Sequence, residues 1–180
     1  MSRSVPEGGL VRLARASERP EGAMANTSLT SYLQDHLAGS AAAVEILEAL
    51  RDAQADKPLG RFASSILVEV ERDRATLEAL ITRLGGGSST LKETAAWLGA
   101  KLSRFKLGHE LSDPLGALEA LEIVALGILG KRALWDALSA LGPTDARLGG
   151  IDLAHLTERA LSQHAQVEQR RLDAARQAFA

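Results

Sequence analysis

The sequence predicts an all-α protein: a four-helix bundle in which one long crossover joins the second helix to the third. Apolar residues make up 46% of the 180 positions but aromatic residues only 3%, so Leu and Ala, which favour helices, must fill the interior. Apolar residues also recur at helical spacing in four long segments. After the Gly- and Ser-rich stretch that ends the second segment, about 25 residues precede the third, which is long for a connection inside one domain.

The first helix is predicted over residues 28–54. Its apolar positions are Leu29, Leu33, Leu37, Val44, Leu47 and Leu50. Residues 1–27 contain scattered Pro and Gly and no apolar signal-peptide core, so we expect a flexible N-terminal tail before a bundle domain over 28–180. Met24 stands directly before the first periodic segment, and the native start is predicted at either Met1 or Met24.

The second helix is predicted from Pro58, a residue suited to a first helical position, to residue 84, where a Gly- and Ser-rich stretch follows. Its apolar positions are Phe62, Ile66, Val70, Leu77, Leu80 and Leu84. The capping-box pattern that begins at Thr90 and ends at Glu93 predicts a short helix within the crossover.

The third helix is predicted over residues 114–141, because Asp113 and Pro114 form a helix start and Gly142 and Pro143 follow its end. The fourth helix begins near Asp152 and runs almost to the end of the chain. Helices of about 25 residues are about 38 Å long. A connection that travels this length is typical of a bundle with one long crossover.

Composition excludes several classes of function. The chain has no Cys, which excludes disulfides and thiolate metal sites. A net charge of −2 and six aromatic residues give little attraction for phosphate backbones or bases, so no nucleic-acid partner is expected. The longest apolar stretch, residues 123–130, is too short for a membrane span. We therefore expect a cytoplasmic protein.

Two segments place a Glu three residues before an Arg: "EVERDR" contains Glu71 and Arg74, and "VEQRR" contains Glu168 and Arg171. Together with the helix order and phrases such as "LEALEIVALGILGKRALW", this resembles the ferritin-like superfamily over residues 28–178, in particular uncharacterised bacterial members. The resemblance implies a di-iron or di-manganese site with one Glu from each of two helices and Glu-x-x-His from each of the other two.

The chain departs from that pattern at both Glu-x-x-His motifs, where Arg74 and Arg171 stand in place of His. A guanidinium group stays protonated and cannot ligate a cation. The resemblance implies that the carboxylate of the third helix is Glu122 or Glu119. For the first helix it offers Glu45, or Asp35 and His36.

We expect the two arginines to replace the metal ions by neutralising a carboxylate cluster in the bundle interior, because a buried carboxylate needs a cationic partner. The members of this buried charge cluster are Glu71, Arg74, Glu122, Glu168 and Arg171. The alternative is that these charges lie on the solvated flanks of amphipathic helices.

A metal site remains the alternative interpretation. His36 and His164 continue the apolar stripes of their helices, and Asp73 lies on the stripe of the second helix between Val70 and Leu77. These side chains could ligate zinc, iron or manganese or form a hydrogen-bonded core network. The ligands of a divergent di-metal centre would be His36, Asp73, Glu122, His164 and Glu168.

The sequence favours a non-catalytic interaction or stress-associated module without a cofactor or catalytic residues, which associates with itself as a homodimer or with a protein partner. The first alternative is a divergent di-iron or di-manganese oxidase or iron-handling protein. The second is a binder of a small apolar ligand between the helices.

Overall fold

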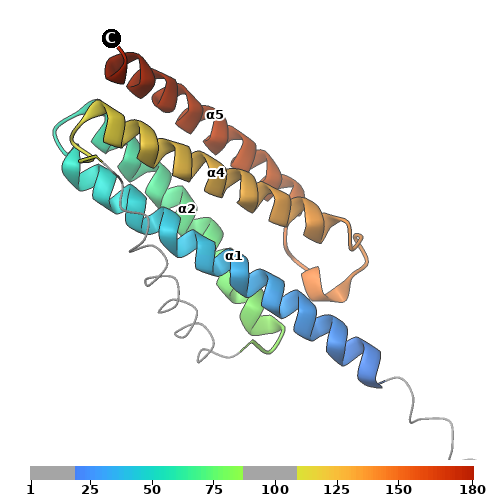
Figure 1. The fold of residues 1–180 in the computed structure, drawn as a ribbon. Helices are drawn as coiled ribbons and strands as arrows, with labels where there is room; N and C mark the ends of the chain where they lie inside the picture. The colour runs from blue at the N-terminus through green and yellow to red at the C-terminus, as the bar shows by residue number, and fades with distance from the viewer. Residues whose placement is uncertain (1–18, 87–108) are drawn as a thin grey trace, which may run out of the picture.

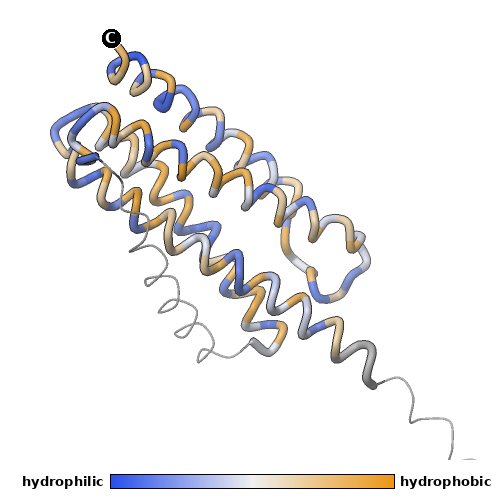
Figure 2. The backbone as a smooth tube through the Cα atoms, in the orientation of Figure 1, coloured by the Kyte–Doolittle hydropathy of each residue, from blue (hydrophilic) through white to orange (hydrophobic). Residues whose placement is uncertain are grey.

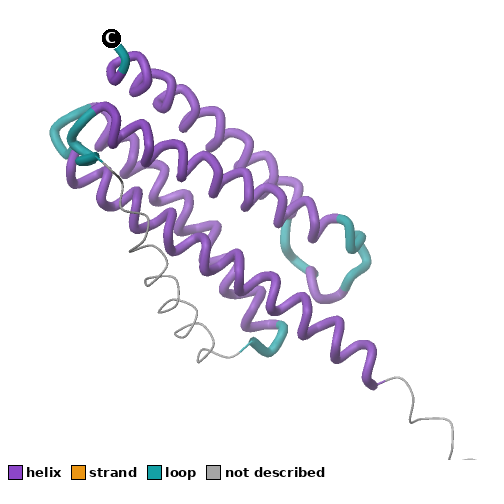
Figure 3. Tube along the Cα trace, viewed as in Figure 1, coloured by secondary structure: helices purple, strands orange, loops and turns teal. Residues whose placement is uncertain are grey.

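The computed structural model describes residues 19–86 and 109–180, and these residues form only helices and loops (Figure 3). The prediction of an all-α protein is confirmed for this part of the chain. The helices are α1 (Arg19–Ala53), α2 (Pro58–Arg83), α4 (Pro114–Ser139), the 3₁₀ helix η1 (Ala146–Leu148) and α5 (Leu153–Ala178) (Figure 1). The short helix predicted at Thr90 lies outside the described residues.

The predicted helix starts agree with the structure except at α1. Helices α2 and α4 begin at Pro58 and Pro114, and α5 follows the N-cap Asp152, whose side chain accepts a hydrogen bond from the His155 amide at 2.9 Å. Helix α1 already begins at Arg19, so residues 19–27, predicted as a flexible tail, are helical. Pro20 lies in its first turn, where a proline does not interrupt helical hydrogen bonds.

Side-chain contacts at the two ends of the bundle define the helix directions. Gln54, just after α1, donates to the carbonyl of Leu111, just before α4, at 2.5 Å. At the other end Arg83 of α2 donates to the carbonyl of Gly149, beyond α4, at 2.6 Å. Helices α2 and α4 therefore run parallel to each other and antiparallel to α1 and α5 (Figure 1). The chain leaves α2 at one end of the bundle and enters α4 at the other, as the predicted long crossover requires.

Helices α2 and α4 share the same local start. Each follows a turn in which the residue before the proline donates its amide to a carbonyl three residues earlier, at 2.9 Å from Lys57 and from Asp113. The third helical residue is a glycine, Gly60 or Gly116. A Cβ at either glycine would lie 2.2 Å from a backbone carbonyl oxygen of the preceding turn, so both starts require glycine.

Apolar stripes of all four helices meet in one core. Hydrophobic and hydrophilic positions alternate along each helix, as expected when one face turns inward (Figure 2). Helix α4 contributes the largest fully buried side chain, Trp135. None of the described helices combines the length and continuous apolar character needed to cross a membrane. Within the described residues, the buried polar or charged side chains are Gln54, Asp73 and Gln163.

Candidate functional site: a buried ion network beside a cavity

Asp73 is the charged side chain at the centre of the bundle. It lies on the inward stripe of α2 between Val70 and Leu77, as its position in the sequence predicts, and it is only 2% exposed. A carboxylate removed from water in this way must be compensated by cations or hydrogen-bond donors. Its partners come from two other helices.

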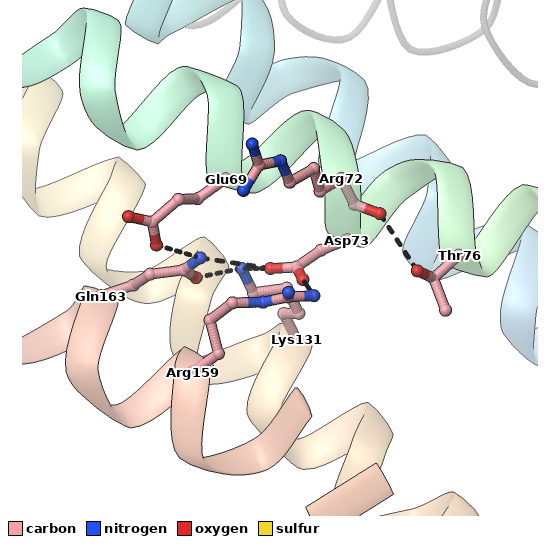
Figure 4. A network of polar contacts seen from close by, with 7 residues as sticks. All are labelled: Glu69, Arg72, Asp73, Thr76, Lys131, Arg159 and Gln163. Atoms are coloured by element: carbon pink, nitrogen blue, oxygen red, sulfur yellow. Dashed lines mark hydrogen bonds and ion pairs between the residues drawn. The ribbon is translucent and has the colours of Figure 1, made fainter. Parts of the chain in front are cut away.

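Both oxygens of Asp73 have partners (Figure 4). Arg159 of α5 donates to Oδ1, and Lys131 of α4 donates to Oδ2. Gln163 of α5 is fully buried and donates from Nε2 to Asp73 Oδ2 at 3.3 Å and to a carboxylate oxygen of Glu69 at 3.0 Å. The Gln163 carbonyl oxygen accepts a hydrogen bond from Lys131. We call these five residues the Asp73 network.

The Asp73 network is balanced in charge, because the cations of Lys131 and Arg159 face the carboxylates of Asp73 and Glu69. Burial lowers the pKa of Lys131, and the neighbouring carboxylate of Asp73 opposes this shift. Paired, hydrogen-bonded charges of this kind hold helices in one arrangement.

A cavity of about 370 Å³ lies beside the network, between α1, α2 and α4. Most of its wall is apolar, with contributions from Ala43, Val70, Leu77, Ile128 and Leu134. Gly39, Gly127 and Gly130 also line it, and a Cβ at Gly39 or Gly130 would have no atom within 4 Å. The helices therefore leave room at these glycines.

The polar part of the cavity wall combines the edge of the network with side chains of α1. Asp73 and Lys131 belong to the network, and α1 adds Tyr32, Asp35 and His36. The rings of Tyr32 and His36 meet edge to face with centroids 4.7 Å apart. Burial lowers the pKa of His36, and the neighbouring Asp35 opposes this shift only in part. Because the net shift is downward, the imidazole is mainly neutral at pH 7.

The predicted buried charge cluster of Glu71, Arg74, Glu122, Glu168 and Arg171 is corrected by the structure. Arg171 does join Glu168, at 2.5 Å, and Glu122, at 3.4 Å, as expected for members of this cluster. These three residues lie at the surface, however, where Glu122 is 51% exposed. The other half of the cluster is not buried either, because Glu71 is exposed and the half-buried Arg74, at the cavity wall, pairs with Glu78 at 3.1 Å.

The alternative metal ligands are not brought together either. Asp73 is occupied by Lys131 and Arg159, Glu122 and Glu168 pair with Arg171, and His36 lies against Tyr32. No group of three or more His, Asp and Glu side chains within residues 19–86 and 109–180 is arranged to hold a metal ion. Glu119 contacts His109 at 3.2 Å, and Glu45 is exposed. His164, half-buried on α5, acts on Glu168, whose pKa is lowered mainly by the hydrogen bond from Arg171 and also by this imidazole.

Sequence reasoning placed Asp73 correctly but missed its partners. Lys131 and Gln163 interrupt the apolar stripes of their own helices, at positions three residues after Ile128 and Ala160. Arg159 directly precedes Ala160. Counting heights from the predicted turns for every polar residue on an apolar stripe would have indicated the pairing of Lys131 and Gln163 with Asp73.

No protein-family model matches the chain, and no curated protein or solved structure matches it either. The resemblance to the ferritin-like superfamily stays a prediction.

Proposed function

We propose that this chain is a non-catalytic binding protein whose cavity between α1, α2 and α4 takes a small ligand with a mainly apolar body. The observation that carries the proposal is the cavity of about 370 Å³ beside the Asp73 network. Its volume lies within the range of known small-molecule sites, and its wall combines apolar side chains with a few converging polar groups.

The network supports a binding role rather than a catalytic one. Asp73 is held by two cations and an amide, and Lys131 donates to both Asp73 and Gln163. A general base or nucleophile needs a free lone pair directed at the substrate. Paired charges instead hold α2, α4 and α5 in place, so that the cavity keeps its shape.

The test is binding of decan-1-ol, a neutral apolar probe, measured by calorimetry and by the fluorescence of Trp135 in a Trp97→Phe background. We expect one saturable site per chain. Gly39→Leu directs a side chain into the cavity and is expected to weaken binding about tenfold or more. Ala49→Leu, on an exposed position of the same helix, is the matched control and should leave binding unchanged. Absence of saturable binding, or equal binding by both variants, would overturn the proposal.

We propose self-association as a second function, because the outer face of α4 is apolar. Leu126 is 69% and Leu129 39% exposed, which is unusual for neighbouring leucines on one helix face. Glu122 precedes and Arg132 follows this pair. They contact Arg171 at 3.4 Å and Asp136 at 3.5 Å within the chain, and both remain exposed enough to reach a partner as well. A second copy packed antiparallel across a two-fold axis would bring these opposite charges together, which favours a homodimer over an unrelated partner.

Light scattering over a range of protein concentrations tests the dimer. The expected mass is that of two chains, and Leu126→Glu should reduce it to one. Val68→Glu, at another exposed apolar position but on α2, should not. A dimer that survives Leu126→Glu would exclude the α4 face.

A further inference from the structure

The charges around the cavity indicate which kind of ligand it takes. Resting on the proposed function, we propose that the ligand is an organic ammonium compound: an apolar body in the cavity, with one positive charge beside Asp35 at the α1 side of the wall.

The first argument is the balance of charge. Four charged side chains line the cavity: Asp35, Asp73, Arg74 and Lys131. Lys131 is paired with Asp73, and Arg74 with Glu78 at 3.1 Å. Asp35 has no hydrogen bond or ion pair within the described residues. Asp35 is exposed, so the wall presents one charge without a side-chain partner among the described residues, at its solvent-exposed edge, and this charge is negative.

The second argument is the neighbourhood of Asp35. Tyr32, Asp35 and His36 lie on one stripe of α1, three and four residues apart. The Tyr32 residue is 37% exposed and offers an aromatic face, which attracts cations. The neutral imidazole of His36 carries a lone pair that accepts a hydrogen bond from an ammonium N–H. Carboxylate, aromatic ring and imidazole together suit a protonated amine.

Other head groups fit less well. An anionic group would meet the carboxylates of Asp35 and Asp73, while the cations that could attract it are already paired. A neutral hydroxyl could donate a hydrogen bond to Asp35 but would lack the attraction between opposite charges. An ammonium group placed beside Asp35, rather than beside Lys131, avoids the positive charges of the network.

The experiment compares three probes with the same chain length: decylammonium, decan-1-ol and decanoate, at pH 7 and low salt. Decylammonium is expected to bind about fivefold more tightly than decan-1-ol, the order of one partly exposed ion pair, and decanoate most weakly. Asp35→Asn should remove the preference for decylammonium and leave the affinity for decan-1-ol unchanged. Asp56→Asn, an exposed carboxylate outside the cavity wall, is the matched control and should keep the preference. Rising salt concentration should reduce the preference as well.

The outcomes separate this inference from the proposed function. Equal affinity for decylammonium and decan-1-ol, or a preference that survives Asp35→Asn, overturns the ammonium assignment while the binding function stands. Tightest binding of decanoate overturns it too. If none of the three probes binds saturably, the proposed function fails, and the inference fails with it.

Discussion

At the scale of single residues, the importance of an ion pair in this protein depends on whether it lies in the interior or at the surface. Asp73 and Glu122 both carry a carboxylate and both pair with an arginine, but Asp73 is 2% exposed and Glu122 is 51% exposed. The buried pair must be complete, because a lone charge in the core is strongly destabilising. The exposed pair contributes little, because water screens it.

Asp145 provides the clearest pH-dependent contact. Hydrogen bonds from the side chain and amide of Arg147 lower the pKa of Asp145 to about 2, and Arg147 also donates to Asn26 of α1 at 3.1 Å. Since the ordinary pKa is 3.8, the unfolded chain takes up the proton first as the pH falls. The stabilisation from Asp145 is therefore complete above about pH 4 and is lost between about pH 4 and pH 2.

We expect Asp145→Asn to lower the free energy of unfolding at pH 7 and to flatten its decline below pH 4. Urea unfolding at a series of pH values from 7 to 2 measures both effects. Asp113→Asn serves as control, because the Asp113 side chain makes no capping hydrogen bond. An unchanged pH profile in Asp145→Asn would show that this carboxylate is not the group that titrates.

At the scale of helices, the shared start of α2 and α4 is a local device built from a turn, a proline and a glycine. The turn carbonyls of Gln54 and Glu110 approach Gly60 and Gly116 so closely that no side chain fits between them. These contacts fix where each helix begins relative to the preceding chain. The two starts lie at the same end of the bundle, because α2 and α4 run parallel.

Gly60→Ala and Gly116→Ala are each expected to reduce the free energy of unfolding by about 1–3 kcal/mol, because the new Cβ meets backbone atoms that cannot rotate away. Gly130→Ala is the control. A Cβ there meets nothing within 4 Å, and alanine favours a helix interior over glycine, so stability should rise by up to about 1 kcal/mol. Thermal and urea unfolding measure the free energy of unfolding of the three variants. An equal change at all three positions would contradict a special requirement for glycine at Gly60 and Gly116.

Proline and glycine also explain how much of the fold can be predicted from the sequence. The starts of α2 and α4 can be predicted from Pro58 and Pro114, because proline suits the first position of a helix and disrupts a helix interior. The predicted start of α1 is wrong, because a proline such as Pro20 fits a flexible tail and the first turn of a helix equally well. Local chemistry allows both interpretations.

The candidate site was only partly predictable, because helical periodicity gives the face of a residue but not what lies opposite. The apolar stripe of the second helix predicts an inward Asp73, and the expected charge cluster includes the pairing of Arg171 with Glu122 and Glu168. That this trio lies at the surface depends on how the helices are rotated. The contact of Lys131 with Asp73 could not be predicted from helical periodicity alone, because lysine is usually exposed, whereas this side chain reaches inward.

At the scale of the whole molecule, the Asp73 network connects two helical hairpins. Helices α1 and α2 pack as one antiparallel pair and α4 and α5 as another. Asp73 and Glu69 come from the first pair, and Lys131, Arg159 and Gln163 from the second. Both ion pairs of Asp73 therefore cross between the hairpins, whereas the hydrogen bond from Lys131 to Gln163 lies within the second one.

Asp73→Leu is expected to lower the free energy of unfolding by about 3–5 kcal/mol, because it leaves the largely covered cations of Lys131 and Arg159, 15% and 23% exposed, without their carboxylate. Adding Lys131→Met and Arg159→Leu removes the stranded charges and should recover most of the loss. Urea unfolding followed by circular dichroism measures both. Glu71→Leu, an exposed carboxylate on the same helix, should change stability little. A triple variant no more stable than Asp73→Leu would mean that the network does more than neutralise charge.

The placement of Asp73 also fixes the register of the bundle. If the α1–α2 hairpin slid along its neighbour by one helical turn, apolar residues would still meet apolar residues, because leucines and valines repeat at every turn. Asp73 would then leave its cations. Leu77 would take the place of Asp73 in one direction of sliding, and Ser65 that of Glu69 in the other, so Lys131 and Arg159 would face one carboxylate instead of two. The pairing of Asp73 thus selects one longitudinal alignment of the two hairpins among several that apolar contacts alone would tolerate.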